Sequence, residues 1–600
     1  MATECEWILK DVDEAAFSRL RSEGENPIMA RLFAGRGIST RAEASVYCNP
    51  VSAALPDPAL LPGAEAAADI ILDSIRNKEK IVVFGDYDAD GVCASAILAT
   101  GLQKLGADVN VVLPDRLAEG YGLSEKSLRR MMTQYPDTKL VITVDNGITA
   151  AAEVDWLKAK GVKVVITDHH LPGDIIPEAD ALVNPKVSSS PGFDDICGAG
   201  VAFFTVNLLV RKAVAAGLYK GGKFGGPLLV LAGIATVADI MPLSGANRTL
   251  VARALKYFPE FQPPGLHELF SVDFPRSTDK ITERDFGFFI GPRLNAAGRI
   301  ESAMTAYRLL VSTDREEARE LAVKVKGLNA GRKGIEEKAI TGVLEKISDD
   351  APAYVVTSKD LHLGVAGIVA ARLSDAKNKP VAVAVEDETG VMNGSVRAPD
   401  GYNMHDALGE ASECLSRFGG HAAAGGFSIK PGMLERFREI FSAACAKQSA
   451  SADCGRKRFF DAWLNFKDLN IELVDSISLL APFGECNPQP VFGMHDVQLE
   501  SVKPIGLDSK HLVLTFSSPR ENTQISASSG IKIATTVNED LPRAVWWNAG
   551  AKAEELKRLK RKRFDIFFKI GENTYPSRTD GDERTPPRRL EFFIEDICRV

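Results

Sequence analysis

The chain has 600 residues, of which 45% are hydrophobic and 25% are charged, and its net charge is −8 at pH 7. This is ordinary globular composition, and the length predicts about three or four domains. The nine cysteines form no CxxC pair, which argues against a disulfide framework or a zinc knuckle and favours a reducing compartment. The acidic total does not exclude nucleic acid, because aspartates that bind a cation are neutralised by it.

Membrane insertion and export are not expected from this sequence. The N-terminal residues Met1–Trp7 lack the basic and apolar regions of a signal peptide. The longest apolar stretch, Leu228–Ala238, is shorter than the about 20 residues that a bilayer span needs. We therefore expect a soluble, cytoplasmic protein.

The chain is expected to begin with a helical segment, residues 1–75, and to continue as an α/β domain over residues 76–313. In this domain, short runs rich in Val and Ile alternate with helical stretches. Such alternation is typical of a doubly wound parallel sheet, whose strands are buried on both faces. Residues 314–350 are charged, with apolar residues every three or four positions, and predict a connecting helix. The expected strands are 81–84, 109–113, 140–144, 162–167 and 182–183.

A second, smaller α/β domain is expected over residues 351–446. It begins with the apolar run Ala353–Val356 and reaches the glycine-rich run Gly419–Gly426. The segment 446–458, rich in Ser, Ala, Lys and Arg, is typical of a linker. Residues 456–600 then hold short alternating runs separated by turn residues, which predict a small antiparallel barrel like an OB fold.

Three aspartates follow the first expected strand. Asp86, Asp88 and Asp90 lie within five residues and precede Gly91. Their carboxylates repel one another unless a cation is present. The alternatives are an ordinary acidic loop and the N-cap of the next helix. An EF-hand is a weaker alternative, because Ile97 and no glutamate stands at the twelfth position.

Three further motifs bear carboxylates or imidazoles. Asp145-Asn146-Gly147 follows an apolar strand, although this tripeptide alone is more often a turn. In Asp168-His169-His170, adjacent side chains of an extended segment point in opposite directions, so one His is expected to bind metal while the other faces substrate or supports a ligand. Asp239 follows another apolar run, and a buried carboxylate there needs a partner.

Together these motifs predict a cation site, because open parallel sheets bind ligands at the carboxyl ends of their strands. Asp and His without Cys favour Mn²⁺ or Mg²⁺ over structural zinc. The ligands suffice for two ions about 3.5–4 Å apart, which would activate a water as the nucleophile and stabilise a phosphoryl transition state. No Ser/His/Asp or Cys/His nucleophile and no Walker-type phosphate loop stands out in the sequence.

These residues carry a family resemblance over nearly the whole chain. The motifs at Asp86–Gly91, Asp145–Gly147, Asp168–His170 and Ala238–Asp239 resemble those of the DHH phosphoesterases. The run Gly419–Gly426 resembles the GGHxxAxG signature of the associated DHHA1 domain. Further segments narrow the resemblance to the RecJ family of single-strand-specific exonucleases. These segments are Asp115–Leu123, Gly291–Arg299 and Pro482–Pro488.

The resemblance implies 5′→3′ hydrolysis of single-stranded DNA to mononucleotides with two Mn²⁺ or Mg²⁺ ions, in DNA recombination and repair. The implied metal ligands are Asp86, Asp88, Asp90, Asp145, His169 and Asp239. Asp168, His170 and His421 would orient ligands or contact the scissile phosphate. Arg116, Ser395 and Arg397 would bind the 5′-terminal phosphate, a task suited to a planar guanidinium fork. The implied substrate path also includes Arg293, Asn295, Arg299 and Gly420.

The resemblance also implies partners, namely single-stranded DNA, a single-stranded-DNA-binding protein and a helicase, and we expect a monomer. One alternative is a phosphoesterase for oligoribonucleotides or cyclic dinucleotides, but such proteins tend to be short and the extra barrel argues against it. Another is an inactive scaffold that only grips single strands, which should have lost ligands that are all present here.

Two features of the last domain leave alternatives open. The run Leu556–Arg563 has six basic residues in eight, and it is either a solvated face or a patch that follows a nucleic-acid backbone. Trp546-Trp547 could offer a ring for base stacking. The favoured interpretation places one ring in the core and leaves the other partly exposed.

Overall fold

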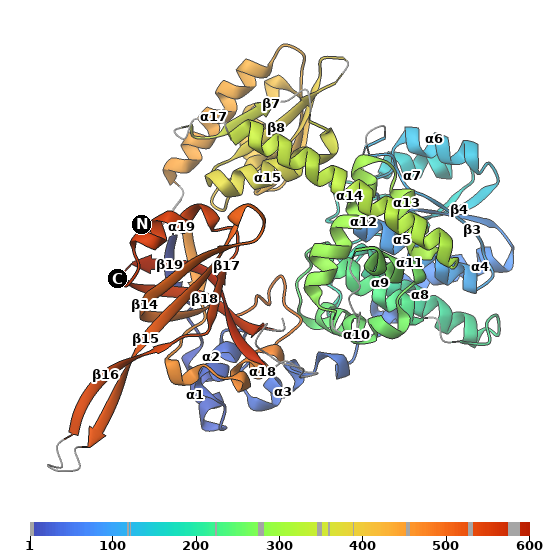
Figure 1. Cartoon of the computed structure of the whole chain (residues 1–600). Coiled ribbons are helices and arrows are strands. Elements are labelled where there is room, and N and C mark those ends of the chain that lie inside the picture. The colour runs from blue at the N-terminus through green and yellow to red at the C-terminus, as the bar shows by residue number, and fades with distance from the viewer. Residues whose placement is uncertain are drawn as a thin grey trace. The chain divides into compact units, whose positions relative to one another are not determined.

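The computed structural model describes residues 5–116, 119–120, 122–222, 225–273, 281–344, 351–357, 361–387, 389–451, 456–525, 532–573 and 588–599. The chain divides into two compact units. One unit is Ala54–Cys454, and the other combines Met1–Ala53 with Gly455–Val600. Figure 1 labels their helices and strands.

The larger unit contains a five-stranded sheet with the order β3-β2-β4-β5-β6. All neighbouring strands in it are parallel. Residues 81–84 of β2 have no exposed surface, so both faces of the sheet are covered. The doubly wound parallel sheet is thereby confirmed. Its strands are β2 (Lys80–Phe84), β3 (Asp108–Val112), β4 (Thr138–Val144), β5 (Lys163–Thr167) and β6 (Ala181–Val183).

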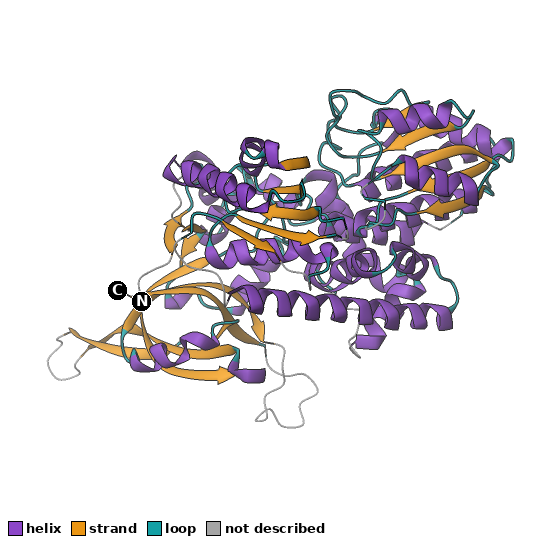
Figure 2. Ribbon diagram, turned by 90° about the horizontal axis from the view of Figure 1, so that it is seen from above, coloured by secondary structure: helices purple, strands orange, loops and turns teal. Residues whose placement is uncertain are grey.

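Two hydrophobic clusters lie on opposite faces of this sheet, since side chains alternate along a strand. Ile81 and Val83 belong to one cluster, and Val82 and Phe84 belong to the other. The first cluster is closed by α4 (Ala64–Arg76), α5 (Ala89–Lys104) and α8 (Gly198–Ala215). The second is closed by α6 (Glu125–Gln134) and α7 (Ala151–Lys158). Figure 2 shows strands enclosed by helices in this way.

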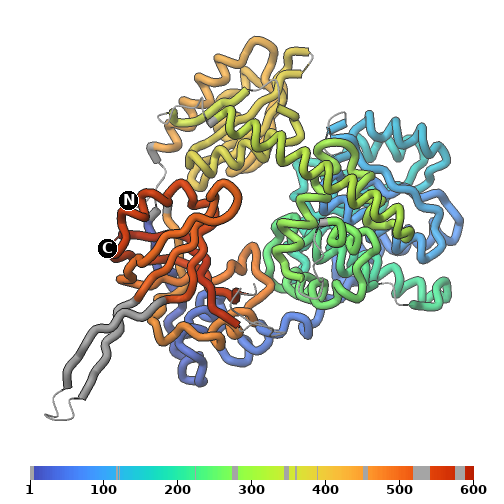
Figure 3. Tube along the Cα trace, in the orientation of Figure 1, coloured from blue at the N-terminus to red at the C-terminus, as the bar shows by residue number. Residues whose placement is uncertain are grey.

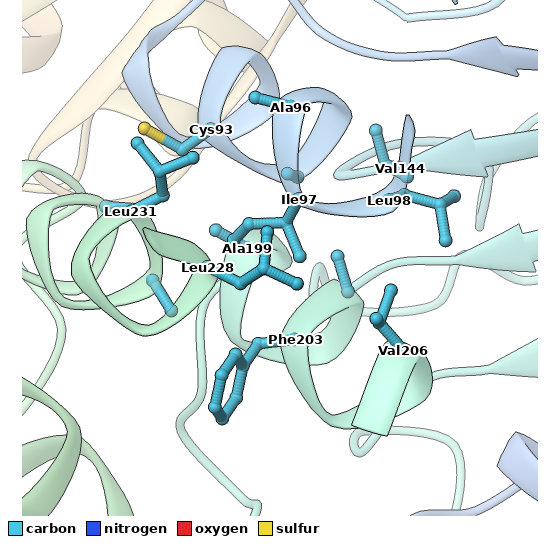
Figure 4. Packing of buried hydrophobic residues seen from close by; sticks show 14 of the residues in the cluster. Cys93, Ala96, Ile97, Leu98, Val144, Ala199, Phe203, Val206, Leu228 and Leu231 are labelled. Carbon is cyan, nitrogen blue, oxygen red and sulfur yellow. The ribbon is translucent and has the colours of Figure 1, made fainter. Parts of the chain in front are cut away.

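Helix α5 lies at the centre of the first cluster. In Figure 4, Ile97 of α5 lies among Phe203 of α8 and Leu228 and Leu231 of α9 (Gly225–Ala238). Helix α8 is long and apolar enough to cross a membrane by length and composition, but 67% of it is buried within the fold. The remaining helices of this half are α10 (Gly245–Phe261), α11 (Pro264–Asp273), the π-helical turn η4 (Asp285–Ile290), α12 (Gly291–Ile300) and α13 (Ala303–Val311).

Helix α14 (Arg315–Leu344) is the predicted connecting helix, and residues 345–350 of that prediction lie outside the described part of the chain. Leu321 and Val325 pack into the core around the parallel sheet. Ile335 and Ile340 pack against the core of the next lobe. One helix therefore takes part in two hydrophobic cores.

The second half of α14 also carries a buried ion network. Glu336 is 1% exposed and accepts a hydrogen bond from Arg332 of the same helix at 2.9 Å. The same carboxylate pairs with Arg372 of α15 (Ala366–Lys377) in the second lobe. The network therefore links the connecting helix to the second lobe.

The second lobe has a mixed five-stranded sheet with the order β10-β11-β9-β8-β7. Only β7 and β8 are parallel neighbours, and the other pairs are antiparallel. Helix α17 (Leu434–Ser451) continues past the predicted domain limit at 446, so the predicted linker begins as helix. The other elements are β7 (Tyr354–Thr357), η5 (Leu363–Val365), β8 (Val381–Glu386), β9 (Met392–Arg397), α16 (Met404–Glu410), β10 (Leu415–Gly420) and β11 (Ala424–Ile429).

The smaller unit is built on a barrel. Its strands follow the order β14-β18-β19-β17-β15, and β14 also pairs with β15 and closes the circle. Most neighbours are antiparallel, and β17 and β19 are parallel. The predicted OB-like barrel is confirmed. Its elements are β14 (Phe492–Ile505), β15 (His511–Ile525), β16 (Lys532–Asp540), β17 (Arg543–Trp546), α19 (Ala553–Arg558), β18 (Arg563–Asn573) and β19 (Arg589–Arg599).

The N-terminal segment is not wholly helical, which corrects the expectation for residues 1–75. Residues Cys5–Leu9 form a strand, β1, that pairs in parallel with β12 (Arg456–Phe460). Figure 3 shows both chain ends on this unit. The helices of the segment are α1 (Glu14–Ser22), α2 (Pro27–Ala34) and α3 (Arg41–Tyr47), and they pack with β13 (Ala462–Trp463) and α18 (Ile471–Ser478). Helix α4 belongs to the larger unit.

The tryptophan pair divides between core and surface, as the favoured interpretation predicts. Trp546 is 7% exposed and Trp547 is 53% exposed. In the basic run, Leu556 is fully buried and anchors α19, while the neighbouring cations are exposed. Two of those cations pair with acids, Lys557 with Glu554 and Arg563 with Asp496. The run is an exposed basic face held by an apolar anchor.

Candidate metal centre

The acidic motifs meet at the carboxyl edge of the parallel sheet. Asp86 follows β2, Asp145 follows β4, and Asp168 and His169 follow β5. Asp239 comes from the C-terminal end of helix α9 and not from a strand. Asp88 is the N-cap of α5 and accepts the Gly91 N–H at 3.0 Å, so the N-cap alternative and the cluster coexist.

His169 stands at the centre of the cluster. Its Nε2 lies 3.1 Å from Oδ1 of Asp145 and 3.7 Å from Oδ2 of both Asp90 and Asp239. Three sets of three residues could each hold a metal ion. Within each set the ligand atoms lie within 4.8 Å of one another, and two of the sets share Asp145. The sets are Asp86, Asp88 and Asp145; Asp90, His169 and Asp239; and Asp145, His169 and His170.

The electrostatics of this cluster demand a cation. Burial, followed by the repulsion of neighbouring carboxylates, raises the pKa of Asp86 and of Asp145 well above the ordinary range. The same causes raise the pKa of Asp88, and they raise the pKa of Asp239 to about 9. Buried carboxylates remain charged only when an opposite charge compensates them.

Two buried oxygens supply a direct test of fit. Oδ1 of Asp86 and Oδ2 of Asp239 accept no hydrogen bond from any residue that the structure describes. Oxygen and imidazole ligands suit Mn²⁺ and Mg²⁺, and no described cysteine belongs to the three sets. The residues present therefore fit a divalent cation of this kind.

Asp168 is engaged differently from its neighbours. Its Oδ2 accepts the Ile148 N–H at 3.0 Å, and its Oδ1 accepts Nδ1 of His170 at 2.8 Å. Burial raises the pKa of Asp168, but the His170 hydrogen bond and backbone donors lower it further, so the carboxylate stays ionised. Burial lowers the pKa of His170, yet the bond to Asp168 raises it more, above the ordinary value. Asp168 thus orients His170, whose side chain is 45% exposed.

Asp90 has a second task beside its place in the cluster. Its oxygens accept the backbone N–H groups of Gly198 at 2.7 Å and Ala199 at 2.8 Å, at the start of α8. A carboxylate is stabilised at the positive end of a helix dipole. A Cβ on Gly198 would lie 2.6 Å from Cβ of Asp145, so the helix approaches this closely only with glycine there. Asp90 therefore fastens α8 beneath the cluster.

Helix α12 backs the aspartate loop, and two residues expected on the substrate path make protein contacts there. Oδ1 of Asn295 accepts the Ala89 N–H at 2.8 Å, between two of the aspartates. Arg293 donates to the Phe289 carbonyl at 2.9 Å and covers the Phe289 ring at 3.7 Å. These contacts hold the loop and the helix, and the substrate roles of both residues stay predictions.

Arginines from both lobes gather beside the cluster. Cζ of Arg116 lies 5.0 Å from the centre of the Tyr87 ring. Arg299 at the end of α12 donates to the Gly364 carbonyl of the second lobe at 3.0 Å. Burial, and then the charge of Arg116, lowers the pKa of Arg299 to about 10 and also lowers the pKa of Arg397. These guanidinium groups lie within electrostatic reach of one another, and an anion among them would be stabilised.

The first turn of α15 faces the second-lobe members of this group. A Cβ on Gly367 would lie 3.2 Å from Nη2 of Arg397 and 3.4 Å from Oγ of Ser395. Both residues lie on β9. The structure thus places Arg397 and Ser395 side by side at the first turn of α15, and their role at the 5′-terminal phosphate stays a prediction.

His421 and Gly420 belong to none of the three ligand sets, and they lie where β10 turns into β11. The His421 side chain is exposed, and its backbone N–H bonds the Ala424 carbonyl at 2.8 Å. A Cβ on Gly420 would lie 2.4 Å from that carbonyl oxygen, and its φ is +139°, so the hairpin requires glycine. The phosphate role of His421 and the place of Gly420 on the substrate path stay predictions.

Sequence reasoning missed three features of the site. The contact of Tyr87 with Arg116 was not predicted, although Tyr87 lies between two of the aspartates. The contact of Gly198 with Asp145 was not predicted either, because the two residues lie far apart in the chain. The glycines Gly364 and Gly367 sit where the second lobe meets Arg299 and Arg397. The available signal was a pair of glycines at the start of a helix, because Gly364 precedes α15 and Gly367 lies in its first turn.

Family comparisons divide the chain into three parts. Residues 80–221 match the DHH family, N-terminal domain. Residues 350–447 match the DHHA1 domain, and residues 460–580 match the RecJ OB domain.

Curated relatives match most of the chain. The single-stranded-DNA-specific exonuclease RecJ of Haemophilus influenzae is 31% identical over 540 residues, which are 87% of this chain and 92% of that protein. The protein of the same name from Bacillus subtilis is 34% identical over 529 residues, which are 86% of this chain. The match spans 65% of the length of the Bacillus subtilis relative.

Solved structures agree with the fold and with the cation. The structure of RecJ in complex with Mn²⁺ from Thermus thermophilus has a TM-score of 0.80 and 28% identity, and the match covers 100% of this chain and 80% of that one. The Mg²⁺ complex of the same protein has a TM-score of 0.74 and 26% identity, with 100% and 79% of the two chains covered.

Proposed function

Because this chain belongs to the RecJ family, we propose that it is a metal-dependent single-stranded-DNA exonuclease. We further propose that it degrades strands in the 5′→3′ direction to mononucleotides, in DNA recombination and repair. The observation that carries the proposal is the cluster around His169, in which carboxylates from separate motifs lie within 4.8 Å. An inactive scaffold would have no reason to keep these buried acids together, because each costs stability unless a cation is bound.

The proposed ligands of the two ions, Mn²⁺ or Mg²⁺, are those implied by the resemblance. Two ligand sets share Asp145, so this carboxylate is the candidate for a bridging ligand. Such a pair of ions, when bound, supplies an activated water and charge stabilisation for in-line displacement at phosphorus. The proposed ligands are Asp86, Asp88, Asp90, Asp145, His169 and Asp239.

His170 is the proposed protein group at the scissile phosphate. The hydrogen bond from Nδ1 to Asp168 fixes the orientation of the ring and directs Nε2 away from that carboxylate. Burial lowers the pKa of His170, but the bond to Asp168 raises it above the ordinary value, which favours the protonated ring. His170 can therefore donate a hydrogen bond to the phosphate or to the leaving oxygen. Asp168 would act through His170.

The arginine group is the proposed site of the 5′-terminal phosphate. Arg116 repels both Arg299 and Arg397, and a phosphate dianion among them would offset that repulsion. The Ser395 hydroxyl and the first turn of α15 would add neutral donors. A grip on the terminal phosphate beside the metal centre would make the enzyme cut from the 5′ end. His421 is proposed to contact the scissile phosphate, and Gly420 and the OB-like barrel are proposed to guide the rest of the strand.

The test is end-labelled single-stranded DNA, carrying a 5′ phosphate or a 5′ hydroxyl, incubated with and without Mn²⁺. We expect Mn²⁺-dependent release of 5′ mononucleotides from the wild type. Asp145→Ala and His169→Ala should abolish release while the circular dichroism spectrum is retained. Cleavage that persists in clean preparations of both variants would refute the assignment. A preference for dinucleotides over long strands would instead favour a small-substrate phosphoesterase.

The cellular setting is also part of the proposal. By family resemblance, we propose a cytoplasmic monomer that works with a helicase and a single-stranded-DNA-binding protein. Size-exclusion chromatography with light scattering tests the monomer, and co-purification with each candidate partner tests the interactions.

A further inference from the structure

Tyr87 is an aromatic residue inside the aspartate loop, and helix α12 packs against its backbone. A Cβ on Gly298 of α12 would lie 2.4 Å from the Tyr87 carbonyl oxygen and 3.2 Å from its Cβ, so the loop rests directly on this helix. Asn295 of the same helix holds the Ala89 N–H two residues later. A tyrosine phenol has an ordinary pKa of about 10, so the ring carries no charge at neutral pH. The ring is therefore a fixed, uncharged surface.

The partner of this surface is a guanidinium group. Arg116 lies on the turn after β3, and its Cζ is 5.0 Å from the ring centre. The face of an aromatic ring attracts a cation, and the attraction grows when water is excluded. Arg299 and Arg397 repel Arg116, since its charge contributes to lowering the pKa of both. Asp86 attracts Arg116, and the Tyr87 ring offers the guanidinium a face to pack on, so both favour its place beside Arg299 and Arg397.

We infer that Tyr87 is a positioning residue for recognition of the 5′ end: its ring holds Arg116 where the guanidinium meets the terminal phosphate. This inference rests on the proposed function, and it adds a residue that contacts neither metal nor substrate. Asp86 and Asp88 flank Tyr87, so one rigid loop sets both the metal centre and the position of Arg116.

Two variants separate the ring from the rest of the side chain. Tyr87→Phe keeps the aromatic face and loses only the hydroxyl, whereas Tyr87→Leu keeps apolar bulk and loses the face. For 5′-phosphorylated strands, we expect Tyr87→Leu to raise KM by about fivefold, with a smaller change in kcat. The preference for 5′-phosphate over 5′-hydroxyl strands should fall by a similar factor. Tyr87→Phe should match the wild type.

A double-mutant cycle with Arg116→Ala identifies the partner. If the ring acts through Arg116, Tyr87→Leu adds little in the Arg116→Ala background. The inference would be overturned if the effects of Tyr87→Leu and Arg116→Ala on KM multiplied in the double variant. It would also be overturned if Tyr87→Phe and Tyr87→Leu lost the 5′-phosphate preference equally. Mn²⁺ titration of each variant, followed by electron paramagnetic resonance, provides a readout besides activity. Normal Mn²⁺ binding in Tyr87→Leu supports the inference, and its loss would show that Tyr87 serves the metal loop instead.

A wild type that shows no preference for a 5′ phosphate would refute the proposed terminal-phosphate site, and with it this role of Tyr87. A wild type that keeps the preference while Tyr87→Leu keeps it too would refute the inference alone. The two failures are therefore distinguishable.

Discussion

Binding of Mn²⁺ should release protons, because the buried acids of the centre hold protons when no cation is present. Burial and the neighbouring Asp90 and Asp88 raise the pKa of Asp239 to about 9. A bound cation needs the ionised form. We predict that the apparent affinity for Mn²⁺ rises steeply with pH between pH 6 and 9, by about tenfold per unit from Asp239 alone.

The magnitude follows from the titration of one group. With a pKa of about 9, the Asp239 carboxyl is about 97% protonated at pH 7.5. Removing that proton weakens the apparent affinity by about 30-fold, or ~2 kcal/mol, relative to an ionised site. The raised pKa values of Asp86 and Asp145 act in the same direction. Release of about one proton or more per chain is therefore expected at pH 7.5.

The assay is isothermal titration calorimetry of the full chain with MnCl₂, in buffers of different ionisation enthalpy. Asp239→Asn should bind Mn²⁺ more weakly and release about one proton fewer. Asp137→Asn, at an exposed position just before β4 and at the opposite end of that strand from Asp145, is the matched control and should behave as the wild type. Affinity that does not change with pH, together with heats that do not depend on the buffer, would refute the account of the buried acids.

Three further outcomes test the structure. Asp239 binds its proton more tightly in the folded state than in the unfolded state. Protonated Asp239 therefore stabilises the fold fully below the unfolded pKa near 4, and this stabilisation is lost as pH rises through about 9. The melting temperature of the metal-free protein should fall over this range, and it should fall less in Asp239→Asn. Gly198→Ala should destabilise the larger unit by about 1–3 kcal/mol in urea unfolding and weaken Mn²⁺ binding, because its Cβ would lie 2.6 Å from Cβ of Asp145; Gly409→Ala, with open space around it, should do neither. Glu336→Gln should cost about 3–5 kcal/mol of unfolding free energy by leaving Arg332 buried without its counter-charge; an equal loss in the exposed Glu337→Gln control would contradict this.

The parallel sheet was predictable because its signal is local. Runs such as Ile81–Phe84 are apolar throughout, which a strand buried on both faces requires. Strand β1 was not predictable in the same way, because its partner β12 lies near the other end of the chain. Asp239 was predicted as an acid at the end of an apolar run, although the run proved to be helix α9. A short apolar run does not distinguish a buried helix from a strand.

The candidate ligands were predictable because Asp and His beside strand ends are visible in the sequence. The division of work among them was not. Asp168 and Asp90 have the same side chain as Asp145, yet backbone donors occupy Asp168 and Asp90, while the pKa of Asp145 is raised by burial among other acids. The same holds for Asn295, whose amide oxygen holds the Ala89 N–H. Hydrogen-bond partners of a side chain are set by packing between distant segments, which one sequence does not reveal.

The amino-acid sequence by itself determined the parallel sheet, the three-part architecture and the kinds of side chain at the metal site, because these depend on residue type and on periodicity over short spans. The tertiary structure decided which acids crowd around His169, that Tyr87 carries Arg116, and that Arg299 of one lobe meets Gly364 of the other. Those facts depend on distances of a few ångströms between residues far apart in the chain, and only the packed core fixes such distances.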